Sequence, residues 1–160
     1  RHIVSNGFSK TYAMTGWRLG YAAGPPELIQ AMTMLQQYSF VCAPSMVQYA
    51  GLAALDLDMS AEIAEFRRRR DLIHGALKDD FEMVRPGGAF YIFPKIESKH
   101  WKNDQDFVLD ILNNCHVLLV PGHGFDETYG KMHFRAVFLP PVETLCKAFD
   151  AIETYMNKVA

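Results

Sequence analysis

A long, charged helical segment over residues 60–78 constrains the fold of this chain more than any other feature of its sequence. Its apolar residues recur at the spacing of one helix face, which predicts an amphipathic helix with a core on one side. Those apolar residues are Ile63, Phe66, Ile73 and Leu77. Ser60 is a favourable N-cap residue, and Glu65 stands four residues before Arg69, a spacing that favours an ion pair. Because the pattern of apolar residues differs before and after this segment, we predict that the segment links two lobes.

The two sides of this helix differ in their pattern of apolar residues. Before it, two short strand-like runs, with a turn at Asn6-Gly7, precede two helical stretches. After it, runs rich in aromatic and β-branched residues alternate with helices. The predicted strands lie near residues 3–4, 17–23, 81–84, 89–93, 117–120 and 132–139. The other predicted helices lie near residues 26–37, from 45 onward, and at 106–113 and 141–157. The chain is therefore predicted to be α/β, with an α+β second part.

Charge and hydropathy exclude several classes of partner. Hydrophobic residues make up 49% of the 160 residues, and the formal net charge is −2. This composition suits a globular protein with a core of its own, whereas a dedicated nucleic-acid binder is usually far more basic. The four arginines at 67–70 have acidic neighbours, so we interpret them as a solvated, salt-bridged face. No apolar run approaches the ~20 residues of a membrane-spanning helix, so we expect no membrane partner.

Cysteine and histidine spacing is informative about compartment and metal binding. The three cysteines are odd in number and far apart, which argues against a disulfide framework and favours a reducing, cytoplasmic location. The six histidines show no HxxxH or HExxH spacing, so no metal site is expected. The sequence also begins at Arg1 rather than at a methionine, and we interpret it as a piece that begins inside a longer protein.

Three cationic residues stand in unusual surroundings. Lys10 follows a strand and a turn rather than lying on a helix face. Arg18 is flanked by Trp17 and Leu19, and Arg135 lies within an apolar strand. A buried guanidinium is costly unless an anion pairs with it. Because most carboxylates of this chain fall on helices and loops, we expect the two arginines to bind external anions, and phosphate or carboxylate suits the planar guanidinium.

A lysine near a phosphate-binding arginine suggests a definite chemistry. An unprotonated lysine amine forms an imine with an aldehyde. Pyridoxal phosphate carries both an aldehyde and a phosphate, so Lys10 and Arg18 would anchor its two ends. Arg135 would then bind the carboxylate of an amino-acid substrate.

The stretch SNGFSKTYAMTGWRLGY at residues 5–21 resembles the lysine signature of class I and II pyridoxal-phosphate aminotransferases, which have fold type I. The shared elements are a small, an apolar and a small residue before Lys10, then Arg18 eight residues on, then an aliphatic residue and a glycine. The resemblance continues through PGGAFY at 86–91, VPGHGF at 120–125 and HFR at 133–135. The whole chain thus resembles the C-terminal portion of an aspartate-, alanine- or aromatic-type aminotransferase.

This resemblance implies a fold and a role for each candidate residue. Residues 1–55 would end the large, cofactor-binding domain, and residues 56–160, with the linking helix, would form the small α+β domain. Lys10 would form the Schiff base with pyridoxal phosphate and shuttle a proton, Arg18 would bind the cofactor phosphate, and Arg135 would bind the substrate α-carboxylate. The reaction would transfer an amino group from an L-amino acid to a 2-oxo acid, in a homodimer.

Three alternatives stay open at this point. The same framework occurs in β-lyases that cleave C–S bonds and in aminocyclopropane-carboxylate-synthase-like enzymes, and the piece would also be compatible with a non-catalytic, truncated domain. In the family, the aspartate that pairs with the pyridine nitrogen and the aromatic residue that stacks on the ring lie upstream of the lysine. The tyrosine donated by the partner subunit lies upstream as well. Since nine residues precede Lys10, we expect the isolated chain to be inactive.

Overall fold

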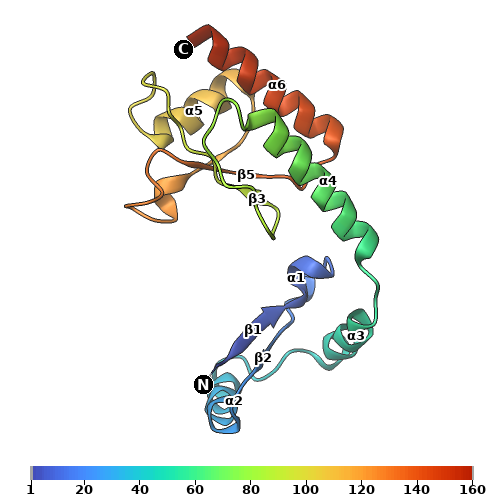
Figure 1. Cartoon of the computed structure of the whole chain (residues 1–160). Helices are drawn as coiled ribbons and strands as arrows, with labels where there is room; N and C mark the ends of the chain where they lie inside the picture. Colours follow the sequence, from blue (N-terminus) through green and yellow to red (C-terminus); the bar gives the residue numbers. More distant parts are fainter. Residues whose placement is uncertain (1, 160) are drawn as a thin grey trace. The chain divides into compact units, whose positions relative to one another are not determined.

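The computed structural model describes residues 2–159, so Arg1, where the sequence begins, lies outside the described part. The chain divides into two compact units, Arg1–Ala61 and Glu62–Ala160. Each unit has a hydrophobic core of its own, and Figure 1 shows the elements that surround each core. The division falls inside helix α4 (Ser60–Leu77). Ser60 is the first residue of this helix rather than its N-cap, and its backbone N–H and hydroxyl both donate to Oδ1 of Asp58.

The first unit is built on a two-stranded antiparallel hairpin. Strand β1 (Val4–Gly7) pairs with β2 (Gly20–Ala23), in a register that runs from Val4 opposite Ala23 to Gly7 opposite Gly20. The other elements are α1 (Phe8–Thr11) and the 3-10 helix η1 (Thr15–Trp17), both between the strands, and then α2 (Pro26–Ser39) and α3 (Ser45–Leu55). The core of this unit consists of Phe8, Met14, Leu19, Val47 and Ala54.

The loop between β1 and β2 is seated on helix α3, because Gly51 of that helix has no side chain. A Cβ atom at Gly51 would collide with Cδ2 of Leu19 and would lie 3.4 Å from the ring of Phe8. The backbone N–H of Phe8 also donates to the carbonyl of Leu19 at 3.1 Å, which closes the two ends of the loop. The residues between Phe8 and Leu19 are therefore held on a fixed base.

The second unit combines a small antiparallel sheet with three helices. Strand β5 (Phe134–Val137) lies between β3 (Tyr91–Ile92) and β4 (Val120–Pro121). Helices α4, α5 (Asp104–Cys115) and α6 (Val142–Val159) lie on one side of these strands (Figure 1). The 3-10 helix η2 (Gly122–Gly124) follows β4 directly. Three aromatic rings meet in the core, with the centroid of Phe134 5.2 Å from that of Phe81 and 5.1 Å from that of Phe107.

The helices are close to their predicted ranges, whereas several predicted strands and one turn are wrong. Asn6-Gly7 belongs to strand β1, because Gly7 pairs with Gly20. The strand predicted at 17–23 begins only at Gly20, since the preceding residues form η1. The strand predicted at 81–84 is reduced to one bridge between Glu82 and Lys95. The apolar run at 117–120 contributes only Val120 to β4.

Helix α5 ends on His116, a residue with left-handed backbone conformation (φ 57°, ψ 32°). Its side chain is exposed, so the conformation has no evident compensation from packing. Glycine is the preferred residue at this position of a helix end, because it has no Cβ to strain. We expect His116→Gly to raise the free energy of unfolding by about 0.5–1 kcal/mol. The midpoint of urea unfolding, followed by the fluorescence of buried Trp101, measures this; an unchanged or lower midpoint would contradict it.

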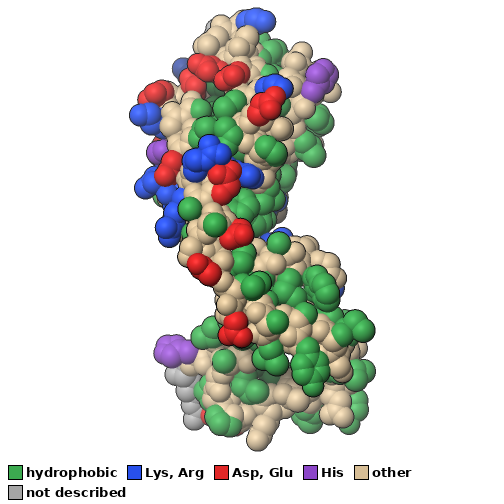
Figure 2. All heavy atoms as spheres, turned by 90° about the vertical axis from the view of Figure 1, so that its right-hand side faces the viewer, with side chains coloured by type: hydrophobic (Ala, Val, Ile, Leu, Met, Phe, Trp, Pro, Cys, Tyr) green, Lys and Arg blue, Asp and Glu red, His purple; other side chains and the backbone are tan. Residues whose placement is uncertain are grey.

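Exposed apolar side chains gather on the surface of the first unit (Figure 2). Eight of them belong to α2 and α3: Met32, Met34, Leu35, Tyr38, Met46, Tyr49, Leu52 and Leu55. Tyr38 is 85% exposed, Met46 is 75% exposed and Tyr49 is 74% exposed. A monomeric domain rarely exposes so much contiguous apolar surface, so this face has the character of an interface.

Ion pairs involve Arg68, Arg69 and Arg70 of α4, as the acidic neighbours of the run suggested. The prediction that the run is solvated is wrong for Arg69 and Arg70, whose side chains are only 18% and 16% exposed. Arg68 and Arg69 both donate to the carboxylate of Glu65, at 2.9 and 2.8 Å. These hydrogen bonds lower the pKa of Glu65 to about 2. Arg70 donates to Asp71 at 2.8 Å. Within residues 2–159, no helix combines the length and the apolar character that crossing a bilayer requires.

Candidate active site

Lys10 and Arg18 lie at the same end of the β1–β2 hairpin. Gly7 and Gly20 form the last pair of the ladder, and Lys10 follows three residues after Gly7, while Arg18 precedes Gly20 by two. Lys10 lies in the short helix α1, and both cationic side chains are exposed. The hairpin therefore presents an amine and a guanidinium from one loop that is fixed at its base.

The conformation of this loop depends on local hydrogen bonds. The hydroxyl of Thr15 donates to the carbonyl of Ser9 at 2.9 Å, and Nη1 of Arg18 donates to the carbonyl of Thr15 at 3.1 Å. Arg18 itself has a left-handed backbone, with φ 53° and ψ 44°. A left-handed backbone is uncommon in a residue other than glycine, and here it lies at the end of the 3-10 helix η1.

The structure corrects the premise on which Arg18 was first singled out. Its apolar sequence neighbours suggested a buried guanidinium, but Arg18 and Trp17 are both exposed. The reason is that residues 15–18 form a 3-10 turn rather than a strand, so Leu19 alone points into the core. Exposure leaves the guanidinium of Arg18 accessible to an anion from solvent.

Arg135 belongs to the second unit and lies in strand β5. Its guanidinium carbon is 4.6 Å from the ring centroid of Tyr91 and 4.4 Å from that of Phe125. Its Nε atom is buried and has no hydrogen-bond partner among the described residues. Aromatic faces stabilise a guanidinium without consuming its in-plane donors. Tyr91 and Phe125 therefore hold the guanidinium without using its donors, and the external anion expected for Arg135 stays a prediction.

Tyr91 and Phe125 are site residues that the sequence analysis did not single out. The place of Tyr91 in β3, opposite Val137, brings its ring beside Arg135 on the neighbouring strand. Phe125 follows the 3-10 helix η2 and is 51% exposed. The signal that could have found Phe125 is its place in VPGHGF, where Pro and two glycines indicate a tight turn.

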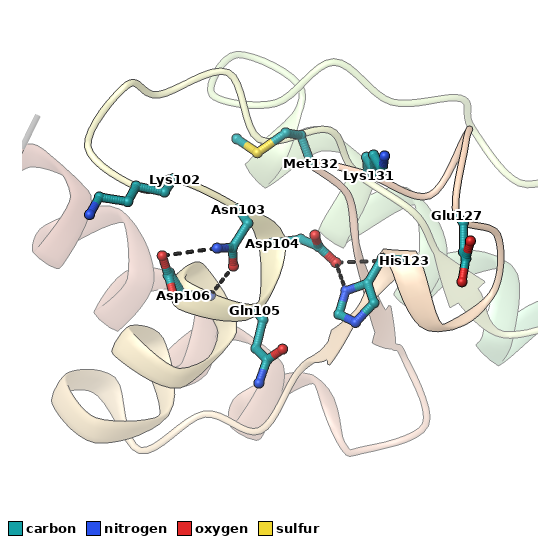
Figure 3. Close-up of a pocket in the computed structure, with 9 residues that line it drawn as sticks. All are labelled: Lys102, Asn103, Asp104, Gln105, Asp106, His123, Glu127, Lys131 and Met132. Carbon is teal, nitrogen blue, oxygen red and sulfur yellow. Dashed lines mark hydrogen bonds and ion pairs between the residues drawn. The ribbon is translucent and has the colours of Figure 1, made fainter.

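A buried carboxylate lies close to this turn. Asp104, at the start of α5, is only 3% exposed, and its Oδ2 accepts from the backbone N–H of His123 at 2.9 Å and lies 2.7 Å from Nδ1 of the same residue (Figure 3). Burial alone would raise the pKa of Asp104, but the hydrogen bonds from His123 outweigh it and lower that pKa below its ordinary value. Asp104 is the one charged residue that is fully buried among the described residues.

The fold and these residues can be compared with known proteins. The family described as aminotransferase class I and II matches residues 1–152 of this chain. The chain belongs to this aminotransferase family.

Three relatives show what share of a family member's length this chain covers. A solved alanine aminotransferase from Pyrococcus furiosus shares 44% identity and a TM-score of 0.88, over 98% of this chain and 42% of that one. In Methanocaldococcus jannaschii, the (5-formylfuran-3-yl)methyl phosphate transaminase is 38% identical over 98% of this chain and 42% of its own length. A probable aspartate aminotransferase of the same organism is 41% identical over 96% of this chain and 42% of its own length. The chain thus has the mixed helix-and-sheet fold of fold-type I aminotransferases and spans about 42% of their length.

Proposed function

We propose that Lys10, Arg18 and Arg135 are the cofactor and substrate contacts of a pyridoxal-phosphate-dependent transaminase. This enzyme would transfer an amino group from an L-amino acid to a 2-oxo acid. The observation that carries the proposal is the register of the β1–β2 hairpin, which sets Lys10 and Arg18 at one end of a loop with a fixed base. The family supports the cofactor, and relatives of this chain include alanine, aspartate and aromatic aminotransferases.

The side chains present fit pyridoxal phosphate. An exposed guanidinium can bind its phosphate through parallel hydrogen bonds, and an exposed amine from the same loop can bond to its aldehyde carbon. When bound, the cofactor supplies that aldehyde and a ring that withdraws electrons from the substrate Cα. The phosphate and the aldehyde of pyridoxal phosphate thus match, in their chemistry, the guanidinium of Arg18 and the amine of Lys10.

Lys10, Arg18 and Arg135 then each have a distinct role. Lys10 holds the cofactor through Nζ and, once displaced by the substrate amine, uses Nζ to accept and return the proton of the substrate Cα. Arg18 fixes the phosphate, so that the reactive end of the cofactor stays near Lys10. Arg135 binds the substrate carboxylate through the in-plane donors that Tyr91 and Phe125 leave unused.

The domain and partner proposals follow the same reasoning. We assign residues 1–55 to the end of a large, cofactor-binding domain and residues 56–160 to the small domain. The exposed apolar face of α2 and α3 supports burial in a homodimer or against further parts of the protein. Well-spaced, free cysteines support a cytoplasmic location, and the family supports a role in amino acid metabolism.

A labelled amino acid tests the reaction class. The full-length gene product, loaded with pyridoxal phosphate, is given ¹⁵N-labelled L-amino acids and 2-oxoglutarate as the acceptor. Transamination moves the label into glutamate and leaves an equal amount of the donor's 2-oxo acid. Label released as ammonia without an acceptor would contradict the proposal and would indicate a β-lyase instead. The 160-residue chain alone, assayed in parallel, is expected to show no turnover.

A further inference from the structure

We propose that Asp104 is a positioning residue for substrate binding, because it holds the turn that keeps Phe125 on the guanidinium of Arg135. The turn in question, Pro121–Phe125, is called the Phe125 turn below. The inference rests on the proposed function, in which Arg135 binds the substrate carboxylate. It adds a residue that touches neither substrate nor cofactor.

The first step is the anchoring of the Phe125 turn by Asp104. One carboxylate oxygen of Asp104 contacts both the backbone N–H and the ring Nδ1 of His123, at 2.9 and 2.7 Å. A buried carboxylate that loses such donors is left uncompensated, so the two residues hold each other in place. Asp106, two residues further along α5 (Figure 3), is different: it is exposed and hydrogen-bonds with Asn103, the N-cap residue of α5.

The second step is the stiffness of the turn between His123 and Phe125. The backbone N–H of Phe125 donates to the carbonyl of Gly122 at 2.9 Å, and that of Gly122 donates to the carbonyl of His133 at 2.8 Å. Gly122 follows β4, in which Val120 pairs directly with Arg135. The Phe125 turn therefore starts beside Arg135, and Asp104 fixes it at His123 in its middle. At its end, the ring of Phe125 again contacts Arg135.

The third step is that the Phe125 ring needs this support. Half of its surface is exposed, at 51%, and its other aromatic neighbour is Phe93, with ring centroids 6.0 Å apart. Packing alone therefore fixes the ring poorly. The ring in turn forms one of the two aromatic faces against which the guanidinium of Arg135 lies, the other being that of Tyr91. If the turn relaxes, Arg135 loses one wall and its planar donors lose their fixed direction.

The kinetic consequence is weaker binding of every substrate that carries an α-carboxylate. We expect Asp104→Asn in the full-length holoenzyme to raise KM for the amino acid and for the 2-oxo acid together. A rise of about tenfold corresponds to the loss of one well-aligned, charge-assisted hydrogen bond. The value of kcat changes much less, since Lys10 is untouched. Asp106→Asn, on the same turn of α5, is the matched control and is expected to leave KM unchanged.

A double-mutant cycle separates positioning from general destabilisation. If Asp104 acts through the ring, Phe125→Leu raises KM to a similar degree, and the variant with both substitutions is no worse than the worse single one. A purely structural effect would instead multiply the two increases in KM. The inference is overturned if Asp104→Asn keeps KM within twofold of the wild type, or if the increases in KM multiply. Asp104→Asn keeps the size of the side chain, so it serves even where Asp104→Ala fails to fold.

Failure of the inference can be told apart from failure of the proposed function. Arg135→Ala raises KM steeply if the proposed function is right, whatever Asp104 does. If Arg135→Ala leaves KM unchanged, the proposed function is wrong at Arg135 and the inference is overturned with it. If Arg135→Ala raises KM and Asp104→Asn does not, the inference alone is overturned.

Discussion

Replacing Lys10 by alanine in the full-length holoenzyme is expected to lower kcat/KM for transamination by about 10⁴-fold, the upper end of what positioned proton transfer contributes. The reason is that one atom, Nζ, would hold the cofactor and then move the proton at the substrate Cα. Lys10 lies in the short helix α1, whose first residue, Phe8, is buried and bonded to Leu19. The exposed lysine side chain is not part of that base, so its loss should leave the fold intact.

Two further variants make this result specific. Lys10→Arg keeps a long cationic side chain, but a guanidinium stays protonated and cannot accept a proton, so we expect it to be as inactive as alanine. Lys147→Ala removes another exposed lysine, which pairs with Glu143 at 2.7 Å on α6, and is expected to retain full activity. Activity of Lys10→Arg near the wild-type level would assign the proton transfer to another group.

The sequence identified Lys10 and Arg18 as site residues but did not predict the backbone conformation of the loop that carries them. Lys10 and Arg18 were identified from their types, their spacing and a family signature, and none of these needs the backbone path between them. The predicted turn at Asn6-Gly7 was wrong because strand pairing overrides a local turn preference once Gly7 finds Gly20. The exposure of Arg18 was missed for a related reason, since a 3-10 turn replaced the expected strand.

The residues that surround Arg135 could not be predicted from its neighbours in the sequence. The expectation of an anion followed from the apolar neighbours of this arginine in sequence, and the unpartnered Nε agrees with it. Its actual walls, Tyr91 and Phe125, come from a different strand and from a turn, and only the order β3–β5–β4 brings them together. Asp104 is a helix residue whose partner is set by the same long-range packing. Period and propensity identify elements, but they do not say which elements are neighbours.

Gly122→Ala is expected to cost about 3 kcal/mol of stability, the upper end of what overpacking a close contact usually costs. A Cβ atom at Gly122 would collide with the carbonyl oxygen of Gly130 and would lie 2.7 Å from the carbonyl oxygen of His133. Both obstacles are backbone atoms, so no side chain can rotate away. The collision also breaks the hydrogen bond from Gly122 to His133, on which the Phe125 turn depends.

The matched control for this substitution lies in the same turn. A Cβ atom at Gly124 would meet nothing within 4 Å, so Gly124→Ala is expected to change the free energy of unfolding by less than about 0.5 kcal/mol. The chain has two tryptophans, so a Trp17→Phe background leaves Trp101 as a fluorescent reporter that belongs to the second unit. Urea unfolding in this background compares the two glycine variants directly. Equal midpoints for them would show that the turn can move away from Gly130, and would remove the rigidity on which the role of Asp104 depends.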